Sequence, residues 1–184
     1  MILAAVPAVG NLLEQAEAAD VSQEVLLHIE QIPEENPVLS AQVIPDYQYN
    51  PSMDMPEELV DGTAYIGTVE IPALELNLPV ISTTTQDNLK KAPCRYSGSA
   101  YQDDLILGAH NYKKHFGRIK SLSYEDQVKV TDLDGNIFSY QVADIEILKP
   151  DQVEDLIGGD WALTLYTCTP GGGSRVVVRC LKTE

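Results

Sequence analysis

The first half of the chain contains no basic residue. Residues 1–89 carry 15 acidic side chains and no Lys or Arg, whereas residues 90–184 carry all 12 basic residues and a net charge of −1. Proteins that bind nucleic acids need clustered Lys and Arg to neutralise phosphates, so a nucleic-acid partner is disfavoured. The excess negative charge suits a solvated tail, and an acidic arm over a partly basic groove is the alternative.

Long apolar runs are also missing. No stretch of about 18 apolar residues occurs, so no membrane-spanning segment is predicted. Residues 1–13 are apolar but short, and they lack the basic start of a signal peptide. Two interpretations fit them: the start of an amphipathic helix, or the end of a membrane anchor whose first part is absent from this chain.

Cysteine and histidine are scarce, with three residues of each. An odd cysteine count argues against a disulfide framework. No pair has Cys-x-x-Cys spacing, the histidines complete no zinc signature, and the carboxylates lack the spacing of a calcium loop. We therefore expect no structural metal and no cofactor, and one cysteine left for chemistry.

The chain before residue 60 resembles a helix followed by a linker. Residues 11–32 have helical spacing, and Pro33 ends the pattern. The expected apolar face consists of six residues: Leu12, Leu13, Val25, Leu26, Ile29 and Ile32. Residues 33–60 contain five prolines among acidic and polar residues, which is typical of a linker. Tyr47 and Tyr49 could still dock this segment onto the domain.

Short strands dominate the remainder. Strands are predicted over 65–71, 76–81, 104–110, 127–132, 137–148, 161–167 and 175–181, with short helices over 87–92 and 112–121. Asp134-Gly135 and residues 170–173 are strong turn signals between strand pairs. Closely spaced strands with few helices favour a closed β-barrel. The chain is therefore expected to divide into an arm, residues 1–60, and a β-barrel domain, residues 61–184.

Three residues at predicted strand ends could carry cysteine chemistry. A cysteine nucleophile needs a stabilised thiolate, a proton donor for the leaving group and a partner for the oxyanion. Cys168 and His110 each end a strand, and Arg175 begins the strand after the glycine turn. Antiparallel neighbours lie about 4.8 Å apart, so Cys168 and Arg175 can share one face. Arg179 has the same parity but lies farther from Cys168, which makes Arg175 the preferred arginine.

The other cysteines and histidines have simpler interpretations. Free cysteines are commonly buried filling, and this is the prediction for Cys94 and Cys180. His115 lies in a predicted helix and is the second choice for a catalytic histidine. His28 belongs to the arm and is not expected to take part.

These segments resemble the sortase family. Residues 164–168, Thr-Leu-Tyr-Thr-Cys, match the family motif Thr-Leu-x-Thr-Cys, and Arg175 with the Val-rich strand after it matches the family arginine. Residues 105–111 resemble the strand that delivers the catalytic histidine, with Ala-His in place of the usual Gly-His. Residues 110–112, His-Asn-Tyr, followed by His115-Phe116, are more similar to class B or clostridial sortases than to the housekeeping class. The resemblance covers roughly residues 62–182.

The resemblance implies an eight-stranded β-barrel that works as a cysteine transpeptidase on a sorting signal related to Leu-Pro-x-Thr-Gly. Cys168 would attack the Thr carbonyl and form a thioacyl enzyme. His110 would protonate the departing amine and deprotonate the incoming one, while Arg175 would steady the substrate carbonyl or the oxyanion. Three flanking residues are expected to bind the substrate: Thr167, Ala109 and Asn111.

The resemblance also implies a cellular setting. The acceptor would be an amine of a peptidoglycan stem peptide or a pilin lysine, and the enzyme would act at the extracellular face of a Gram-positive cell membrane, held by its N-terminal anchor. Class C sortases carry a lid with an Asp-Pro-aromatic motif, which residues 33–60 lack. Part of the acidic arm is still expected to pack beside the barrel.

Two other functions stay open: a non-catalytic barrel that binds peptides, and a cysteine peptidase that only hydrolyses. Other cysteine hydrolases fit less well. Papain-like enzymes place the cysteine before the histidine, and caspases carry a Gln-Ala-Cys sequence that is missing here. L,D-transpeptidases carry a Ser-His-Gly stretch that is also missing.

Overall fold

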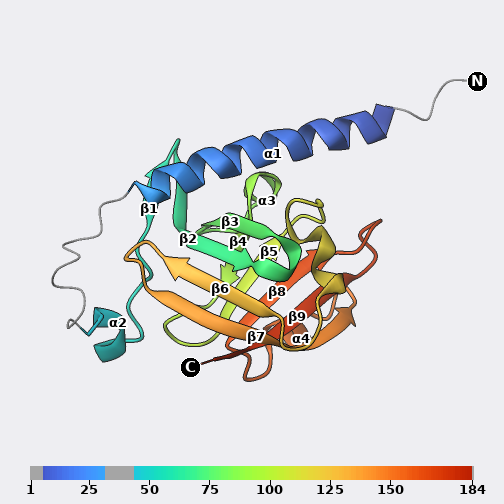
Figure 1. Cartoon of the computed structure of the whole chain (residues 1–184). Coiled ribbons are helices and arrows are strands. Elements are labelled where there is room, and N and C mark those ends of the chain that lie inside the picture. The colour runs from blue at the N-terminus through green and yellow to red at the C-terminus, as the bar shows by residue number, and fades with distance from the viewer. Residues whose placement is uncertain (1–5, 32–43, 184) are drawn as a thin grey trace, which may run out of the picture.

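The fold is seen in a computed structural model that describes residues 6–31 and 44–183. Eight strands close into a barrel in the order β2-β3-β4-β5-β8-β9-β7-β6, and β6 pairs back onto β2 (Figure 1). A further strand, β1, pairs with β2 outside the closed ring. The strands have these bounds: β1 Glu58–Val60, β2 Thr63–Ile71, β3 Leu76–Ile81, β4 Cys94–Ser97, β5 Leu105–Ala109, β6 Gln127–Asp132, β7 Ile137–Leu148, β8 Leu163–Cys168 and β9 Arg175–Lys182. The predicted closed eight-stranded barrel is confirmed.

Helices precede the barrel and fill its connections. Their bounds are α1 Val6–Glu30, α2 Asp46–Tyr49, η1 Pro72–Leu74, α3 Gln86–Lys91, η2 Phe116–Ser121 and α4 Val153–Ile157. The helix predicted over 112–121 is shorter than expected and is the 3-10 helix η2. Five elements were not predicted as helices or strands: α2, β1, η1, β4 and α4. Two of them, α2 and β1, lie in the segment 33–60 that reads as a linker.

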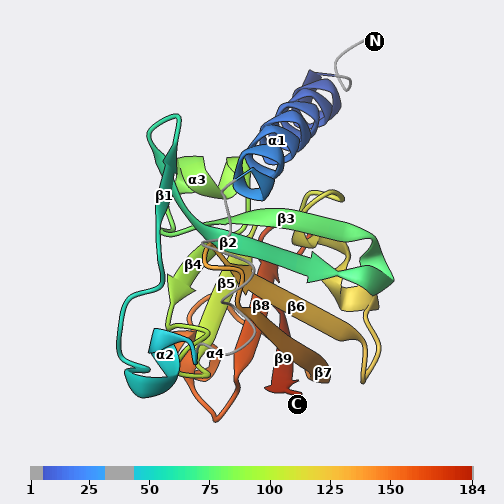
Figure 2. The same ribbon diagram turned by 60° about the vertical axis from the view of Figure 1, so that its left-hand side comes forward.

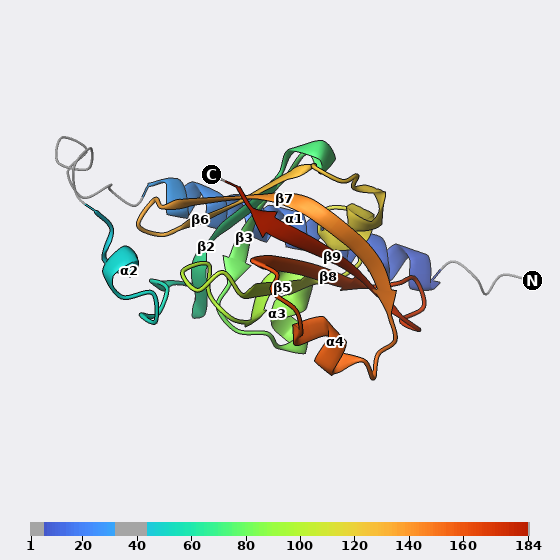
Figure 3. The same ribbon diagram turned by 90° about the horizontal axis from the view of Figure 1, so that it is seen from below.

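Strand alternation divides the barrel into an inner and an outer face. Along β5, β8 and β9 one set of alternate residues belongs to the main core: Leu105, Leu107, Ala109, Leu163, Leu165, Val176, Val178 and Cys180. On the outer face, Val177 of β9 clusters with Leu156 of α4. Figure 3 shows α4 on the outside of the barrel. Because successive side chains of a strand point to opposite faces, the ends of these strands present the outer set to solvent.

The arm packs on the barrel, as the sequence predicts for part of it. Helix α1 crosses one side of the barrel next to α3 (Figures 1 and 2). Ala18, Ser22 and Val25 are buried on one face of α1, and Val25 joins a cluster with Tyr65 and Ile81. The Ser22 hydroxyl donates to a backbone carbonyl at the end of α3.

The predicted apolar face of α1 is seen in part. Val25 is buried, and Leu26 and Ile29 are half-buried. The side chains of Leu12 and Leu13, and the whole of Ile32, lie outside the described residues. Among the helices that the structure describes, none combines the length and apolarity needed to cross a membrane.

The two tyrosines of the arm behave differently. Tyr47 stacks on Tyr101 with ring centroids 4.6 Å apart, and it also contacts Phe138. Tyr49 is 73% exposed. Docking by Tyr47 is therefore confirmed, and Tyr49 contributes no comparable contact.

Candidate active site

The predicted site residues lie at the ends of three neighbouring strands. β5 and β8 run parallel, and their last register pair is Ala109 with Thr167. His110 follows Ala109 and Cys168 follows Thr167 in the sequence. Cys168 pairs with Arg175 of β9. Strand parity puts Cys168 and Arg175 on the outer face, opposite the core-facing Leu165 and Val176 set, and His110 follows the core-facing Ala109 directly after the end of β5. Three residues separated by up to 65 sequence positions are thus brought to one edge of the barrel.

A short, well-bonded loop joins Cys168 to Arg175. The Thr169 backbone N–H donates to the Ser174 carbonyl at 2.8 Å, and the Ser174 N–H donates to the Thr169 hydroxyl at 3.1 Å. Gly171 and Gly172 have φ of 86° and 73°, which side chains with a Cβ rarely adopt. The predicted glycine turn therefore forms and closes directly behind the cysteine.

Cys168 differs from the other two cysteines in exposure. Its side chain is exposed, whereas Cys94 and Cys180 are buried. Burial raises the pKa of Cys94 to about 12 and that of Cys180 to about 12, so both stay protonated near neutral pH. The prediction that Cys94 and Cys180 fill the core is confirmed, and Cys168 is the accessible thiol.

The two arginines of β9 have separate environments. Arg179 is 2% exposed, and its guanidinium donates to Glu146, to the Thr164 hydroxyl and to the backbone carbonyl of Leu156 at 2.8–3.0 Å. Arg175 is half-buried, and no hydrogen bond or ion pair to the residues described in the structure holds its guanidinium. Arg175 therefore keeps donors free beside Cys168, while Arg179 ties α4 and β7 to β9.

His110 is half-buried against an aromatic neighbour. Its ring stacks on Tyr112 with centroids 5.0 Å apart and planes 25° apart. Burial lowers the pKa of His110, the positive charge of Lys90 lowers it further, and the negative charge of Glu14 raises it. Glu14 belongs to α1, so the arm contributes a charge to the surroundings of this histidine.

His115, the second choice, lies deeper. It is 1% exposed, and its ring contacts the ring of Tyr112, with centroids 5.4 Å apart. Within the described residues neither of its ring nitrogens has a hydrogen-bond partner. Burial, with a contribution from the charge of His110, lowers the pKa of His115 to about 4. A neutral and inaccessible imidazole is poorly suited to exchange protons with a peptide.

Two of the three predicted substrate residues have core-facing side chains. Thr167 and Ala109 are buried, and the Thr167 hydroxyl donates to the Ala109 carbonyl at 2.8 Å. This bond ties β8 to β5 immediately before Cys168 and His110. Strand parity is the reason, because each of these residues precedes a residue of the outer face. Asn111 is half-buried in the loop after His110.

Sequence reasoning missed three residues beside the site. Tyr166 lies two positions before Cys168 on the same face, opposite Gly108, with its ring edge-on to Tyr96 at 5.7 Å. A Cβ at Gly108 would lie 2.4 Å from the Tyr166 ring, so the glycine makes room for it. Tyr166 occupies the variable position of Thr-Leu-x-Thr-Cys, so the motif did not single it out. Glu14 and Tyr112 are 98 residues apart, and no local pattern links them.

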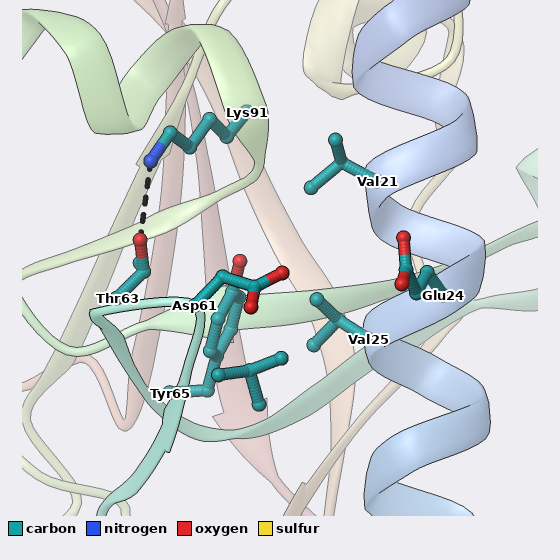
Figure 4. Close-up of a pocket in the computed structure, with 8 residues that line it drawn as sticks. Val21, Glu24, Val25, Asp61, Thr63, Tyr65 and Lys91 are labelled. Atoms are coloured by element: carbon teal, nitrogen blue, oxygen red, sulfur yellow. Dashed lines mark hydrogen bonds between the residues drawn. The ribbon is translucent and has the colours of Figure 1, made fainter.

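A cavity of about 150 Å³ lies elsewhere, between α1 and the β1–β2 hairpin (Figure 4). Val21 and Val25 line it from the helix, and Asp61 faces them from the hairpin. The Lys91 ammonium donates to the Thr63 hydroxyl at 3.1 Å on its border. None of the predicted site residues lines this cavity.

The chain is similar to known sortases. The family model of the sortase domain matches residues 69–183. Sortase A of Bacillus anthracis is 31% identical over 117 residues, which cover 59% of this chain and 54% of that protein. The chain spans about half the length of the curated relatives it matches.

Solved structures agree on the fold. Sortase C1 of Streptococcus suis is 28% identical with a TM-score of 0.55, covering 65% of this chain and 73% of that one. A Clostridium perfringens sortase C, solved with its C-terminal cell wall sorting motif, is 24% identical with a TM-score of 0.63, covering 90% and 99%. The family model alone covers more than half of the chain, and the barrel is that of the solved sortases. The chain therefore belongs to the sortase family.

Proposed function

We propose that this chain is a cysteine transpeptidase that cleaves a Leu-Pro-x-Thr-Gly-like sorting signal between Thr and Gly and passes the acyl group to an amine. The observation that carries the proposal is the meeting of His110, Cys168 and Arg175 at one barrel edge. Cys168 is the exposed thiol, and the Arg175 guanidinium has no hydrogen-bond partner among the residues that the structure describes. Membership of the sortase family supports the reaction class.

The first half of the reaction forms a thioester. The Cys168 thiolate attacks the Thr carbonyl carbon, and the Arg175 guanidinium donates hydrogen bonds to the oxygen as negative charge develops on it. The carbon–nitrogen bond then breaks, and the His110 imidazolium gives its proton to the departing glycine amine. The sulfur keeps the acyl group, and His110 is left neutral.

The second half reverses the proton movement. An incoming amine attacks the thioester, neutral His110 accepts its proton, and the Cys168 thiolate departs. Burial and Lys90 lower the pKa of His110, so the imidazolium is the minor form near neutral pH. Glu14 opposes that effect and increases the fraction of enzyme that is ready to act.

The flanking residues have supporting roles in this proposal. Thr167 and Ala109 hold β8 and β5 together through their hydrogen bond, which keeps the two reactive side chains in register. Asn111 follows His110 outside the core and is the flanking residue that we expect to contact the peptide.

The proposed partners follow from the same chemistry. The donor is a surface protein or pilin with the sorting signal, and the acceptor is a peptidoglycan stem-peptide amine or a pilin lysine. The reaction would take place at the extracellular face of a Gram-positive cell membrane, with the chain held through its N-terminal end. Water as the acceptor would make the enzyme a peptidase, which is the second activity to test.

Peptide cleavage with matched variants tests the proposal. A fluorogenic Leu-Pro-x-Thr-Gly peptide is incubated with wild type and Cys168→Ala, with and without triglycine as acceptor. We expect cleavage by wild type only, and a joined product when triglycine is present. Cys168→Ala that cleaves as fast as wild type would reject the assignment, and cleavage without a joined product would favour the peptidase.

Thiol labelling supplies a control within the chain. Since Cys94 and Cys180 are buried and Cys168 is exposed, iodoacetamide should label folded wild type once and folded Cys168→Ala not at all. Labelling in denaturant should recover the buried thiols. An unlabelled wild type that still binds the peptide would point to the non-catalytic barrel.

A further inference from the structure

The loop after His110 is tied to the N-terminal helix at two successive positions. The Tyr112 hydroxyl donates to Glu14 Oε2 at 2.9 Å, and the Lys113 backbone N–H donates to Gln15 Oε1 at 3.3 Å. Glu14 and Gln15 belong to α1, almost a hundred residues earlier in the sequence. The helix therefore reaches the site and contacts the segment that carries the proposed proton donor.

Tyr112 is held from three sides. It is 6% exposed and its ring stacks on His110. Its hydroxyl is bound by Glu14, and its carbonyl accepts the N–H groups of His115 and Gly117 at 3.0 and 2.9 Å. A fixed aromatic face beside an imidazole restricts the rotation of that ring, because offset stacking has a preferred geometry.

The charges around His110 come from several elements. Glu14 approaches from α1 and Lys90 from α3, and their effects on its protonation are opposite. Tyr112 and His115 belong to the loop after it, and His115 is buried and neutral near pH 7. Cys168 and Arg175 lie at the ends of β8 and β9. Glu14 is the carboxylate that acts on both His110 and Tyr112.

We propose that Tyr112 and Glu14 are positioning residues for His110, so that helix α1 is part of the catalytic machinery. Tyr112 fixes the plane of the imidazole, and Glu14 fixes Tyr112 while favouring the imidazolium. The inference rests on the proposed role of His110 as the proton donor. It adds the requirement that the arm must be docked for full activity.

An NMR titration of His110 tests the effect of the Glu14 charge without any substrate. The histidines of the whole chain are labelled with carbon-13, and His110→Gln assigns the signal. Glu14→Gln keeps a hydrogen-bond acceptor but removes the negative charge that raises the pKa of His110, so that pKa should fall. Glu17→Gln, one turn along the same helix at an exposed position, is the matched control and should leave the titration unchanged.

Steady-state kinetics test whether the Tyr112 ring positions His110. Tyr112→Leu should lower kcat about tenfold with little change in KM, since a misplaced general acid slows the chemical step. Tyr112→Phe keeps the ring but loses the hydrogen bond to Glu14, so its kcat should lie between those of wild type and Tyr112→Leu. The same His110 titration in Glu14→Gln and Glu17→Gln, or a Tyr112→Leu with the kcat of wild type, would overturn the proposal. An inactive wild type with the expected titration shift would instead reject only the proposed function.

Discussion

Arg175 and Arg179 show how environment separates two identical side chains on one face of β9. Arg179 lies under α4, where Glu146, Thr164 and a backbone carbonyl occupy its donors. Arg175 lies at the strand end opposite Cys168, and its guanidinium has no hydrogen-bond partner in the described part of the chain. A buried arginine that connects several elements acts on stability, and an arginine at a reactive edge acts on catalysis.

Alanine substitutions should separate these two roles. Arg179→Ala leaves Glu146 and Thr164 without their partner and should reduce the free energy of unfolding by about 3 kcal/mol. Arg175→Ala should change that free energy by less than about 0.5 kcal/mol. It should nevertheless lower kcat/KM by roughly 100-fold or more, because the oxyanion loses its donor.

Urea unfolding and peptide cleavage on the same preparations give the two readouts. Each variant serves as the control for the other, since both remove one guanidinium from β9. An Arg175→Ala variant with normal turnover would contradict the role given to this residue. An Arg179→Ala variant as stable as wild type would contradict the structural role given to Arg179.

At the scale of elements, barrel closure depends on the pairing of β2 with β6. Gly67 lies at a register shift in β2 and pairs with Asp132. Its φ is 139°, and a Cβ there would lie 1.9 Å from the Thr131 carbonyl oxygen. Neither backbone can move without opening the ring, so glycine is required at this position.

Gly67→Ala should therefore destabilise the barrel by about 3 kcal/mol, through both the clash and the backbone conformation. Gly173→Ala is the matched control, because nothing lies within 4 Å of a Cβ at that position. Thermal unfolding followed by circular dichroism compares the two. Equal melting temperatures for both variants would mean that the β2–β6 seam tolerates a side chain.

Much of the barrel could be predicted from local patterns. The bounds of β3, β6 and β7 agree with the predicted strands, because alternation and flanking turns are clear there. β4 was missed, since Cys94–Ser97 follows Pro93 and meets β3 at the single pair Ile81 with Cys94. α2 and β1 were missed because prolines dominate that segment.

At the scale of the whole molecule, the site combines local motifs with contacts that no motif records. The neighbouring positions of Cys168 and Arg175 could be predicted, because strand parity and a glycine turn connect them. The contact of Glu14 with Tyr112 depends on how α1 docks across the barrel. Likewise, strand parity places Thr167 on the face opposite Cys168, but only the folded chain reveals that its hydroxyl binds the Ala109 carbonyl.

His115 makes the stability of the whole fold sensitive to acid. Its pKa is lowered to about 4 in the folded chain, whereas an unfolded histidine has a pKa of about 6.5. Between these values the unfolded chain binds the extra proton, so stability falls as pH decreases through that window. The expected loss is on the order of 3 kcal/mol between pH 7 and pH 4.

His115→Leu removes this titration and keeps an apolar side chain in the site. Urea unfolding of wild type and His115→Leu at both pH values isolates the contribution from those of the other groups. As pH falls, the free energy of unfolding of wild type should decrease more than that of His115→Leu. A difference in free energy of unfolding that does not change with pH would show that His115 has the same pKa in the folded and the unfolded chain, as an imidazole exposed to water would.

Trapping the acyl enzyme tests the central claim most directly. The whole chain is mixed with a Leu-Pro-x-Thr-Gly peptide in the absence of an acceptor amine, quenched in acid, and examined by intact-protein and peptide mass spectrometry. The account predicts an adduct with the mass of the peptide up to its Thr, located on Cys168 and released by hydroxylamine. Cleavage of the peptide with no adduct on Cys168, or with the adduct on another residue, would contradict it.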